Sequence, residues 1–240
     1  MPVTLFISDL HLCPTRPQIT ALFLRLLEGE VRQAEALYIL GDLFEYWIGD
    51  DDCVDPFNAT IITALRQLSD SGTNIFLMHG NRDFLLGTAF CRSAGVTLLD
   101  DPTMINLHGT ATLLMHGDTL CTDDIKYQAF RKQVRDPAWQ QQFLSQPLAQ
   151  RTAIAQEYRR ISETAKQTKA MGIKDVTLET LEAVLRQYNY PRLIHGHTHR
   201  PAHHVHHVDG HHCERIVLTD WNEHGGYLRC DESACSAIVV

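Results

Sequence analysis

Five short polar blocks, each placed directly after an apolar run, constrain this sequence more than any other feature. The runs, at residues 3–8, 36–40, 75–78, 111–115 and 192–194, have the length and composition of strands. The blocks contain carboxylate, imidazole and amide side chains, which bind metal ions. They are Asp9-Leu10-His11, Gly41-Asp42, Gly80-Asn81-Arg82-Asp83, His116-Gly117-Asp118 and Gly196-His197-Thr198-His199. Strand ends that deliver such ligands to one place predict a two-metal hydrolytic site.

The spacing and chemistry of the blocks restrict the metal. Asp9 and His11 are two positions apart at a strand end, so both side chains can project from one face. His197 and His199 share this spacing. Neutral imidazoles with carboxylate and amide oxygens suit Mn²⁺, Fe²⁺ or Zn²⁺, and the lack of cysteine ligands argues against a structural zinc. A carboxylate such as Asp42 can bridge two cations ~3.5–4 Å apart, a pair that lowers the pKa of bound water.

Composition limits the remaining classes of protein. The 240 residues, 44% of them apolar and 21% charged, suit one globular domain with room for an insertion. No run approaches the ~20 apolar residues of a membrane span, and the N-terminus lacks a signal-peptide pattern, so we expect a cytoplasmic location. A net charge of −8 disfavours a general nucleic-acid binder. The seven cysteines are odd in number and scattered, which favours reduced thiols.

The chain alternates strands and helices before a helical segment. Apolar spacing predicts helices over residues 19–31 and 57–68, which indicates an α/β core. Residues 123–169 are helical throughout by pattern, and another helix is expected over 175–188. We therefore predict a single domain, residues 1–240, with a helical insertion at 123–169. From Lys126 to Lys169 the insertion holds nine Lys/Arg against three Asp/Glu, a local charge of +6.

The C-terminal part returns to strands. Asp209-Gly210 suits a tight hairpin turn between strands at 203–208 and 215–219. A second strand pair is expected to flank Gly225-Gly226, and residues 236–240 read as a final strand.

The blocks resemble, in content and order, the calcineurin-like metallophosphoesterase superfamily. The resemblance spans residues 9–199 and implies a two-sheet β-sandwich flanked by helices, with the metal site at its rim. The helical insertion, with basic residues interleaved among aromatic and aliphatic ones, is expected to cap that site. The resemblance also implies the ligands of two metal ions. One ion would take Asp9, His11, Asp42 and His199, and the other Asp42, Asn81, His116 and His197.

Longer stretches are similar to the UDP-2,3-diacylglucosamine diphosphatases of lipid A biosynthesis. They are residues 8–12, 41–51, 80–84, 116–124 and 195–201. That family uses Mn²⁺ to cleave its UDP-linked lipid into UMP and 2,3-diacylglucosamine 1-phosphate (lipid X) at the cytoplasmic face of the bacterial inner membrane. The likeness implies two Mn²⁺ ions per chain and a peripheral membrane contact, and we expect a monomer. It assigns catalysis to Asn81, Arg82 and His116, and substrate contacts to Asn81, Arg82, Asp124, Ser162, Lys166, Lys169 and His197. At Lys166 the family can carry Asn, so this chain departs from the pattern there.

Arg82 supports a phosphoanhydride substrate independently. Many superfamily members place a histidine after Gly-Asn, where it can protonate a leaving alkoxide. Arginine does not give up a proton at working pH, but it can bind phosphate oxygens in a bidentate manner. A phosphate leaving from a diphosphate is already a stable anion and needs no such proton.

Plainer interpretations exist for each feature. The ligands could be polar loop residues, and Arg82 a surface ion pair with Asp83 or Asp50. Asp83 and Asp118 are expected to orient ligand histidines, and the histidines between 203 and 212 to form a solvated surface. The insertion could be plain core helices, without a substrate or membrane role. The alternatives for the whole protein are another phosphoesterase on the same fold and a non-catalytic scaffold.

Overall fold

Two mixed β-sheets form the centre of the protein in a computed structural model, which describes residues 2–168 and 175–240, without the side chains of 163–168. The six-stranded sheet runs β11(Cys235–Val239)–β10(Gly226–Cys230)–β1(Thr4–Ile7)–β2(Ala36–Ile39)–β3(Asn74–Met78)–β4(Thr97–Leu99). The five-stranded sheet runs β5(Thr103–Leu107)–β6(Thr110–Met115)–β7(Arg192–His195)–β9(His211–Val217)–β8(Ala202–Val208). In both sheets the strands that carry the ligand blocks are parallel to one another, so their carboxyl ends lie at one edge.

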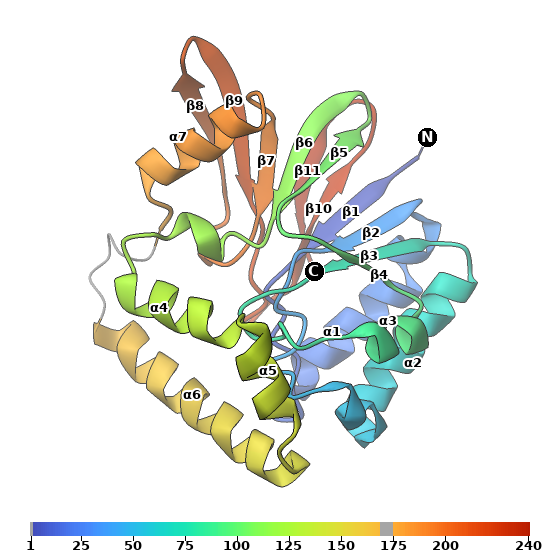
Figure 1. The fold of residues 1–240 in the computed structure, drawn as a ribbon. Coiled ribbons are helices and arrows are strands. Elements are labelled where there is room, and N and C mark those ends of the chain that lie inside the picture. The colour runs from blue at the N-terminus through green and yellow to red at the C-terminus, as the bar shows by residue number, and fades with distance from the viewer. Residues whose placement is uncertain (1, 169–174) are drawn as a thin grey trace.

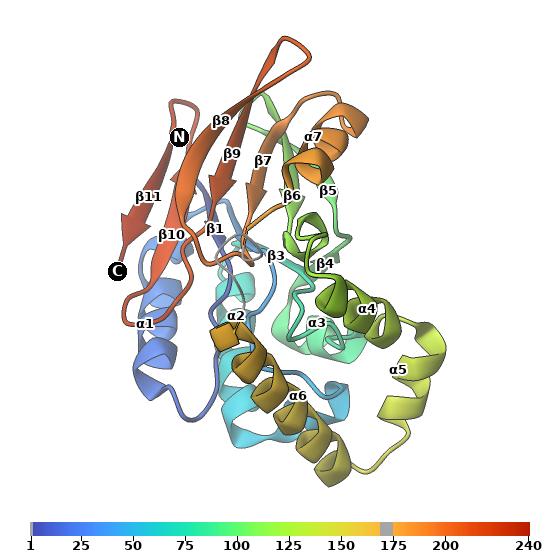
Figure 2. The same cartoon turned by 90° about the vertical axis from the view of Figure 1, so that its left-hand side faces the viewer.

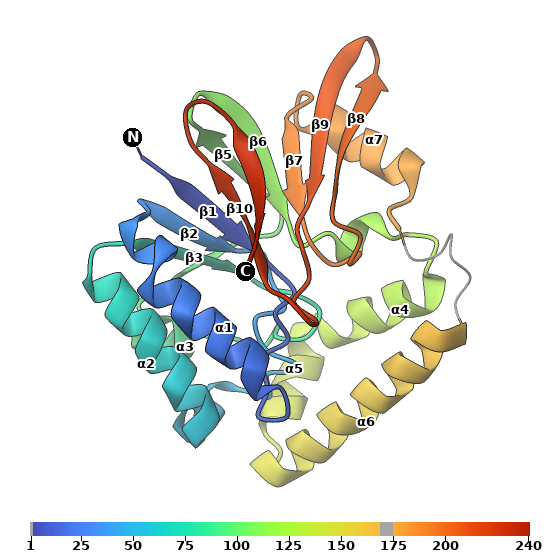
Figure 3. The same ribbon diagram turned by 180° about the vertical axis from the view of Figure 1, so that it is seen from behind.

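Helices cover the outer faces of both sheets (Figures 1 and 3). The six-stranded sheet is covered by α1(Pro17–Glu28), α2(Pro56–Asp70) and α3(Thr88–Ala94), and the five-stranded sheet by α7(Leu178–Gln187). Short 3₁₀ helices lie at Glu30–Gln33, Asp50–Val54 and Asp118–Leu120. Between the sheets a separate apolar layer contains Phe6, Leu114 and Ile194. The expected two-sheet sandwich flanked by helices is confirmed.

Local sequence explains where the helices begin. Pro56 opens α2, and the Asp55 carboxylate accepts hydrogen bonds from the backbone N–H groups of Phe57 and Asn58. The buried face of α2 carries Ile61 and Leu65, at helical spacing, toward the sheet.

Three further helices lie beyond the carboxyl end of β6, away from the tip of the β8–β9 hairpin (Figure 2). They are α4(Ile125–Val134), α5(Pro137–Leu144) and α6(Leu148–Thr168), and we call them the cap. Asp124 and Asp136 cap the first two through backbone N–H groups. The helices match the segment expected to be helical, whereas its status as a separate insertion in the domain stays a prediction. No helix of the described residues is long and apolar enough to cross a membrane.

The C-terminal strands agree only in part with the sequence. The hairpin turn at Asp209-Gly210 is confirmed, because both residues have positive φ and β8 pairs with β9 around them. The expected strand pair around Gly225-Gly226 is wrong. Gly226 begins β10, and the chain turns after Cys230 to pair β10 with β11.

One disulfide contradicts the expectation of reduced thiols. Cys230 lies opposite Cys235 in the β10–β11 ladder, with the two Cα atoms 4.1 Å apart, and their sulfurs are bonded. The sequence spacing alone showed no pair, because the proximity arises from the strand register. The other five cysteines are free.

Candidate metal centre and substrate cavity

Most of the expected metal ligands have an unusual backbone conformation. Five of the seven have positive φ, between 51° and 66°, a region that non-glycine residues rarely adopt. Each such residue costs about 1–3 kcal/mol, and such conformations cluster at functional sites. The five are Asp9, His11, Asp42, His197 and His199. The turns after β1, β2 and β7 therefore aim these side chains at a common point instead of relaxing into regular loops.

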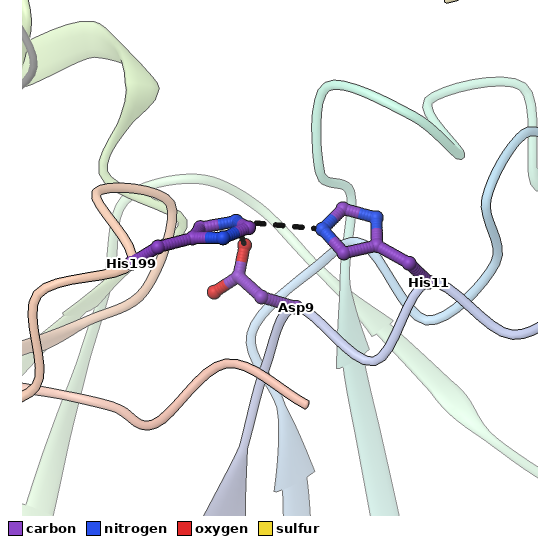
Figure 4. Close-up of side chains that lie close together, drawn as sticks. All are labelled: Asp9, His11 and His199. Carbon is purple, nitrogen blue, oxygen red and sulfur yellow. Dashed lines mark hydrogen bonds and ion pairs between the residues drawn. The ribbon is translucent and has the colours of Figure 1, made fainter. Parts of the chain in front are cut away.

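One group of ligand atoms joins the loops after β1 and β7 (Figure 4). His11 Nε2 and His199 Nε2 are 3.4 Å apart, and His199 Nε2 lies 3.5 Å from Asp9 Oδ1. The other Asp9 oxygen, Oδ2, accepts hydrogen bonds from the Ser8 hydroxyl and the His197 backbone N–H. Asp9 Oδ1 is buried and accepts no hydrogen bond. One oxygen is thus anchored while the other faces two imidazoles, which fits a cation site.

A second group lies beside the first and is fully buried. Ligand atoms of Asp9, Asp42 and His116 lie within 4.8 Å of one another. The amide oxygen of Asn81 is 3.0 Å from His116 Nε2 and 2.9 Å from His197 Nδ1. All seven residues expected to bind metal therefore come together.

Asp42 lies between the two groups. Its Oδ2 is 3.9 Å from His11 Nε2, and its Oδ1 is 3.9 Å from His116 Nε2. The Arg82 backbone N–H donates to Oδ1 at 2.8 Å. This placement suits a carboxylate that bridges two cations.

Two glycines allow the loops to approach this closely. A Cβ at Gly80 would lie 2.0 Å from Asp42 Oδ1, and one at Gly196 would lie 2.2 Å from Asp9 Oδ2. Both contacts are far inside van der Waals distance, so any side chain there would displace a ligand carboxylate.

The electrostatics of the centre favour bound positive charge. Burial lowers the pKa values of His116 and His199, but nearby carboxylates outweigh this and raise both to about 9. Burial raises the pKa of Asp42 to about 7. Burial also acts to raise the pKa of Asp9, yet the contact with His199 and the neighbouring imidazolium charges hold it well below its usual range. Divalent cations would supply the same charge as these protons.

His197 differs from His116 and His199, because its pKa is lowered instead of raised. Burial and the charge of His116 lower its pKa to about 3. A neutral imidazole keeps a lone pair for a metal ion.

Four carboxylates around the centre support it in ways the sequence did not reveal. Asp83 was expected to orient a histidine, but it accepts backbone N–H groups of Leu43 and Gly80 at 2.7 and 2.9 Å. Asp118 was also expected to orient a histidine, but its carboxylate accepts hydrogen bonds from the side chains of Tyr127 and Arg131 in the cap. Histidines are instead contacted by two residues that the sequence analysis missed. Asp220 lies 3.1 Å from His199 Nδ1, and Glu45 lies 3.5 Å from His11 Nδ1.

A cavity of ≈ 600 Å³ opens from the metal centre toward the cap. Its metal end includes Asp42, Asn81 and His197, and its far wall is largely apolar. The apolar wall comprises Trp47, Phe84, Leu85, Phe130, Trp139, Phe143, Tyr158 and Ile161. Five of the expected substrate contacts line this cavity, namely Asn81, Arg82, Asp124, Ser162 and His197. Lys169 and the side chain of Lys166 fall outside the described residues.

Arg82 faces the cavity and is not an ion pair with either carboxylate that the sequence suggested. Asp83 is occupied by backbone N–H groups, and Asp50 accepts from Gly87 and Ala89 at the start of α3. The Arg82 Nε–H is buried without a hydrogen-bond partner. A guanidinium in this position is available to an anion in the cavity.

The histidines of the β8–β9 hairpin take no part in this centre. They are mostly exposed, as expected for a solvated surface. Among the described residues, the only groups of three or more possible ligands are the two above. His195, near the ligand pair, is buried and contacts the Gly196 carbonyl through Nδ1 at 2.8 Å.

The fold and this centre define a metallophosphoesterase. Residues 2–201 match the calcineurin-like phosphoesterase family, and the chain belongs to that family. It is 56% identical over 227 residues to a UDP-2,3-diacylglucosamine hydrolase of Aromatoleum aromaticum, covering 95% of this chain and 92% of the relative. It is 52% identical to a protein of the same name from Xanthomonas axonopodis pv. citri, over 97% of each chain. Among solved structures, an archaeal phosphodiesterase aligns over 99% of each chain with 14% identity and a TM-score of 0.49.

Proposed function

We propose that this protein hydrolyses the diphosphate bond of UDP-2,3-diacylglucosamine in lipid A biosynthesis, releasing UMP and 2,3-diacylglucosamine 1-phosphate (lipid X). One observation supports this most: the buried metal centre opens into a cavity that is polar at the metal end and apolar along the cap. A substrate with a diphosphate at one end and acyl chains at the other matches that division. The relatives named UDP-2,3-diacylglucosamine hydrolase align with nearly the full chain.

The two groups of ligands would hold two Mn²⁺ ions. The first ion would take Asp9, His11, Asp42 and His199, and the second Asp42, Asn81, His116 and His197. When bound, such a pair activates water and stabilises negative charge on phosphorus. The donor set fits, because Asp9 Oδ1 is buried without a hydrogen bond and the paired imidazoles face each other.

The protein's own residues position the diphosphate. The Arg82 guanidinium, with its buried Nε–H, would donate to phosphate oxygens and stabilise the charge that develops as the bond to the α-phosphorus breaks. Asn81 and His116 are the other catalytic groups in our proposal, and Asn81 Oδ1 lies 3.0 Å from His116 Nε2. Asp124, Ser162, Lys166, Lys169 and His197 would contact the substrate. The leaving phosphate needs no proton, so no general acid is required.

The cap also suggests how the protein meets its substrate. Ile125, Leu144 and Ile161 are exposed on cap helices, in a segment with a local charge of +6. Exposed apolar side chains among basic residues suit peripheral contact with an anionic lipid surface. We propose that the protein binds the cytoplasmic side of the inner membrane in this way, as a monomer, and does not bind nucleic acid.

Turnover in H₂¹⁸O would test the proposal directly. The protein is incubated with Mn²⁺ and the UDP-linked lipid, and the label is located by mass spectrometry. Label in UMP supports attack of water on the α-phosphorus. Label in the sugar phosphate would overturn the position of attack. Turnover of phosphomonoesters alone would favour another phosphoesterase activity, and no turnover with any phosphoester would favour a non-catalytic scaffold.

A further inference from the structure

Four arginines of the cap reach into the loops that carry the metal ligands. Arg131 and Arg135 lie in and just after α4, and Arg151 and Arg159 lie on α6. Arg131 contacts Asp118, and Arg135 contacts the Gly80 carbonyl. Arg151 contacts residues 48–51, and Arg159 contacts Glu45. The local charge of +6 in this segment therefore serves in part to dock the cap, and not only to meet a substrate or a membrane.

The α4 half of the cap holds the two loops of the second ligand set. The Asp118 carboxylate, two residues after His116, accepts from Arg131 Nε at 2.7 Å and from the Tyr127 hydroxyl at 2.5 Å. Arg135 donates to the Gly80 carbonyl at 2.8 Å, directly before Asn81. Asp118 is fully buried, so it depends on these donors.

The α6 half holds the loop of the first set. Arg159 forms an ion pair with Glu45, whose other oxygen is 3.5 Å from His11 Nδ1. Arg151, only 2% exposed, binds the Ile48 carbonyl and the Asp51 carboxylate in the segment that starts at Asp42.

We propose that the cap is a positioning device for the metal centre, with its two halves serving different ions. The α4 half would hold the loops of the second ion, and the α6 half the histidine of the first. This rests on the ligand assignment of the proposed function. Because binding energies are coupled in both directions, occupancy of each ion would also tighten the half of the cap that serves it.

The division of the cap is tested by replacing single arginines in variants that keep the ligands of only one of the two ions. In His116→Ala, which keeps the first set intact, Arg159→Gln is expected to weaken Mn²⁺ binding about 10-fold, and Arg135→Gln to leave it unchanged. In His11→Ala, which keeps Asn81 and His116, we expect the reverse: Arg135→Gln weakens Mn²⁺ binding and Arg159→Gln leaves it unchanged. Lys132→Gln is the matched control, because it removes one charge from an exposed position on α4. Free Mn²⁺ is counted by electron paramagnetic resonance, so no turnover is needed.

Two further measurements separate docking from misfolding. Glu45→Gln removes the Arg159 ion pair from the side of the sheets, without altering α6. It should weaken the first ion as Arg159→Gln does, and the double variant should add little more. Hydrogen exchange of α4 and α6 should slow when Mn²⁺ is added to the wild type.

The outcomes distinguish this inference from the proposed function. A wild type that binds fewer than two Mn²⁺ ions overturns the ligand assignment and this inference with it. The wild type could instead bind two ions while both arginine variants lose Mn²⁺ affinity equally in both backgrounds, or lose no affinity at all. Either result would overturn the division of the cap into two halves and leave the ligand assignment standing.

Discussion

Asp220 holds the His199 imidazole from the side opposite the metal centre. Its Oδ2 lies 3.1 Å from His199 Nδ1, while Nε2 of the same ring faces Asp9 Oδ1 at 3.5 Å. A carboxylate that accepts the Nδ1–H of a metal-binding histidine fixes the ring and leaves the Nε2 lone pair for the ion. Asp220 lies in the loop after β9, so a loop outside the five ligand blocks completes the site.

Asp220→Ala is therefore expected to weaken Mn²⁺ binding about 10- to 100-fold, the usual cost of losing such a partner. Isothermal titration of metal-free protein measures it. Glu223→Gln, an exposed change three residues away, is the control. Equal affinities in Asp220→Ala and the wild type would show that the carboxylate does not orient the ligand.

Gly80→Ala and Gly196→Ala should each abolish the stabilisation of the fold by Mn²⁺. The added methyl would lie 2.0 Å from Asp42 Oδ1 in the first variant and 2.2 Å from Asp9 Oδ2 in the second. Thermal unfolding with and without Mn²⁺ measures the effect, because a ligand that binds only the folded state raises its melting temperature. Gly29→Ala, whose Cβ would stay 3.3 Å from its nearest neighbour, should keep the shift.

The convergence of the expected ligand residues was predictable from sequence, because the signal that marks them is local. A strand-like run followed by Asp, His or Asn places a polar side chain at a strand end, and parallel strands bring those ends together. The seven residues that the pattern and the family resemblance together single out as ligands converge in the structure.

The supporting residues could not be predicted, because their roles arise only from tertiary packing. Asp220 and Glu45 are ordinary acidic residues in sequence, and nothing near them marks a histidine partner. The cap arginines read as a basic helical segment whose partners lie far away along the chain. Similarly, the Cys230–Cys235 bond depends on the pairing of β10 with β11. The sequence did not reveal this pairing, because Gly225 and Gly226 suggested a turn at the wrong position.

Metal affinity should rise with pH up to about 9. His116 and His199, with pKa values raised to about 9 by nearby carboxylates, must lose their protons to bind a cation. Each proton displaced increases the affinity up to ~10-fold per pH unit. Titrations in buffers of different ionisation enthalpy would count the protons released at pH 7. Release of none would contradict the protonated state of both rings.

The metal-free protein should show the opposite trend in stability. Both histidines have folded-state pKa values above the ordinary 6.5, so their protonation stabilises the fold fully below pH 6.5. That contribution is lost as the pH rises through about 9. Urea unfolding in EDTA at pH 6.5, 7.5 and 8.5 should therefore show decreasing stability, and saturating Mn²⁺ should remove this slope.

Arg82→Lys should lower diphosphate cleavage by about 100-fold, although the charge is kept. Lysine cannot reproduce the planar, bidentate donor pattern of the guanidinium. Steady-state rates on the UDP-linked lipid measure the loss, and Arg25→Lys, the same change at an exposed position on α1, is the control. Our assignment would fail if Arg82→His left diphosphate cleavage intact while the wild type hydrolysed phosphomonoesters well.

Trp139→Ala should raise KM for the diacylated substrate about 10-fold and change kcat little. The Trp139 ring lines the apolar wall of the cavity, stacked on Phe143 with their ring centroids 5.0 Å apart. Its loss removes apolar contact area from a region away from the metal ligands, so it acts on binding and not on the reacting atoms. Gln142→Ala, at an exposed position on the same helix and outside the cavity lining, is the matched control. The decisive comparison uses a UDP-glucosamine without acyl chains: an equal rise in KM for that compound would show that Trp139 does not contact the acyl chains.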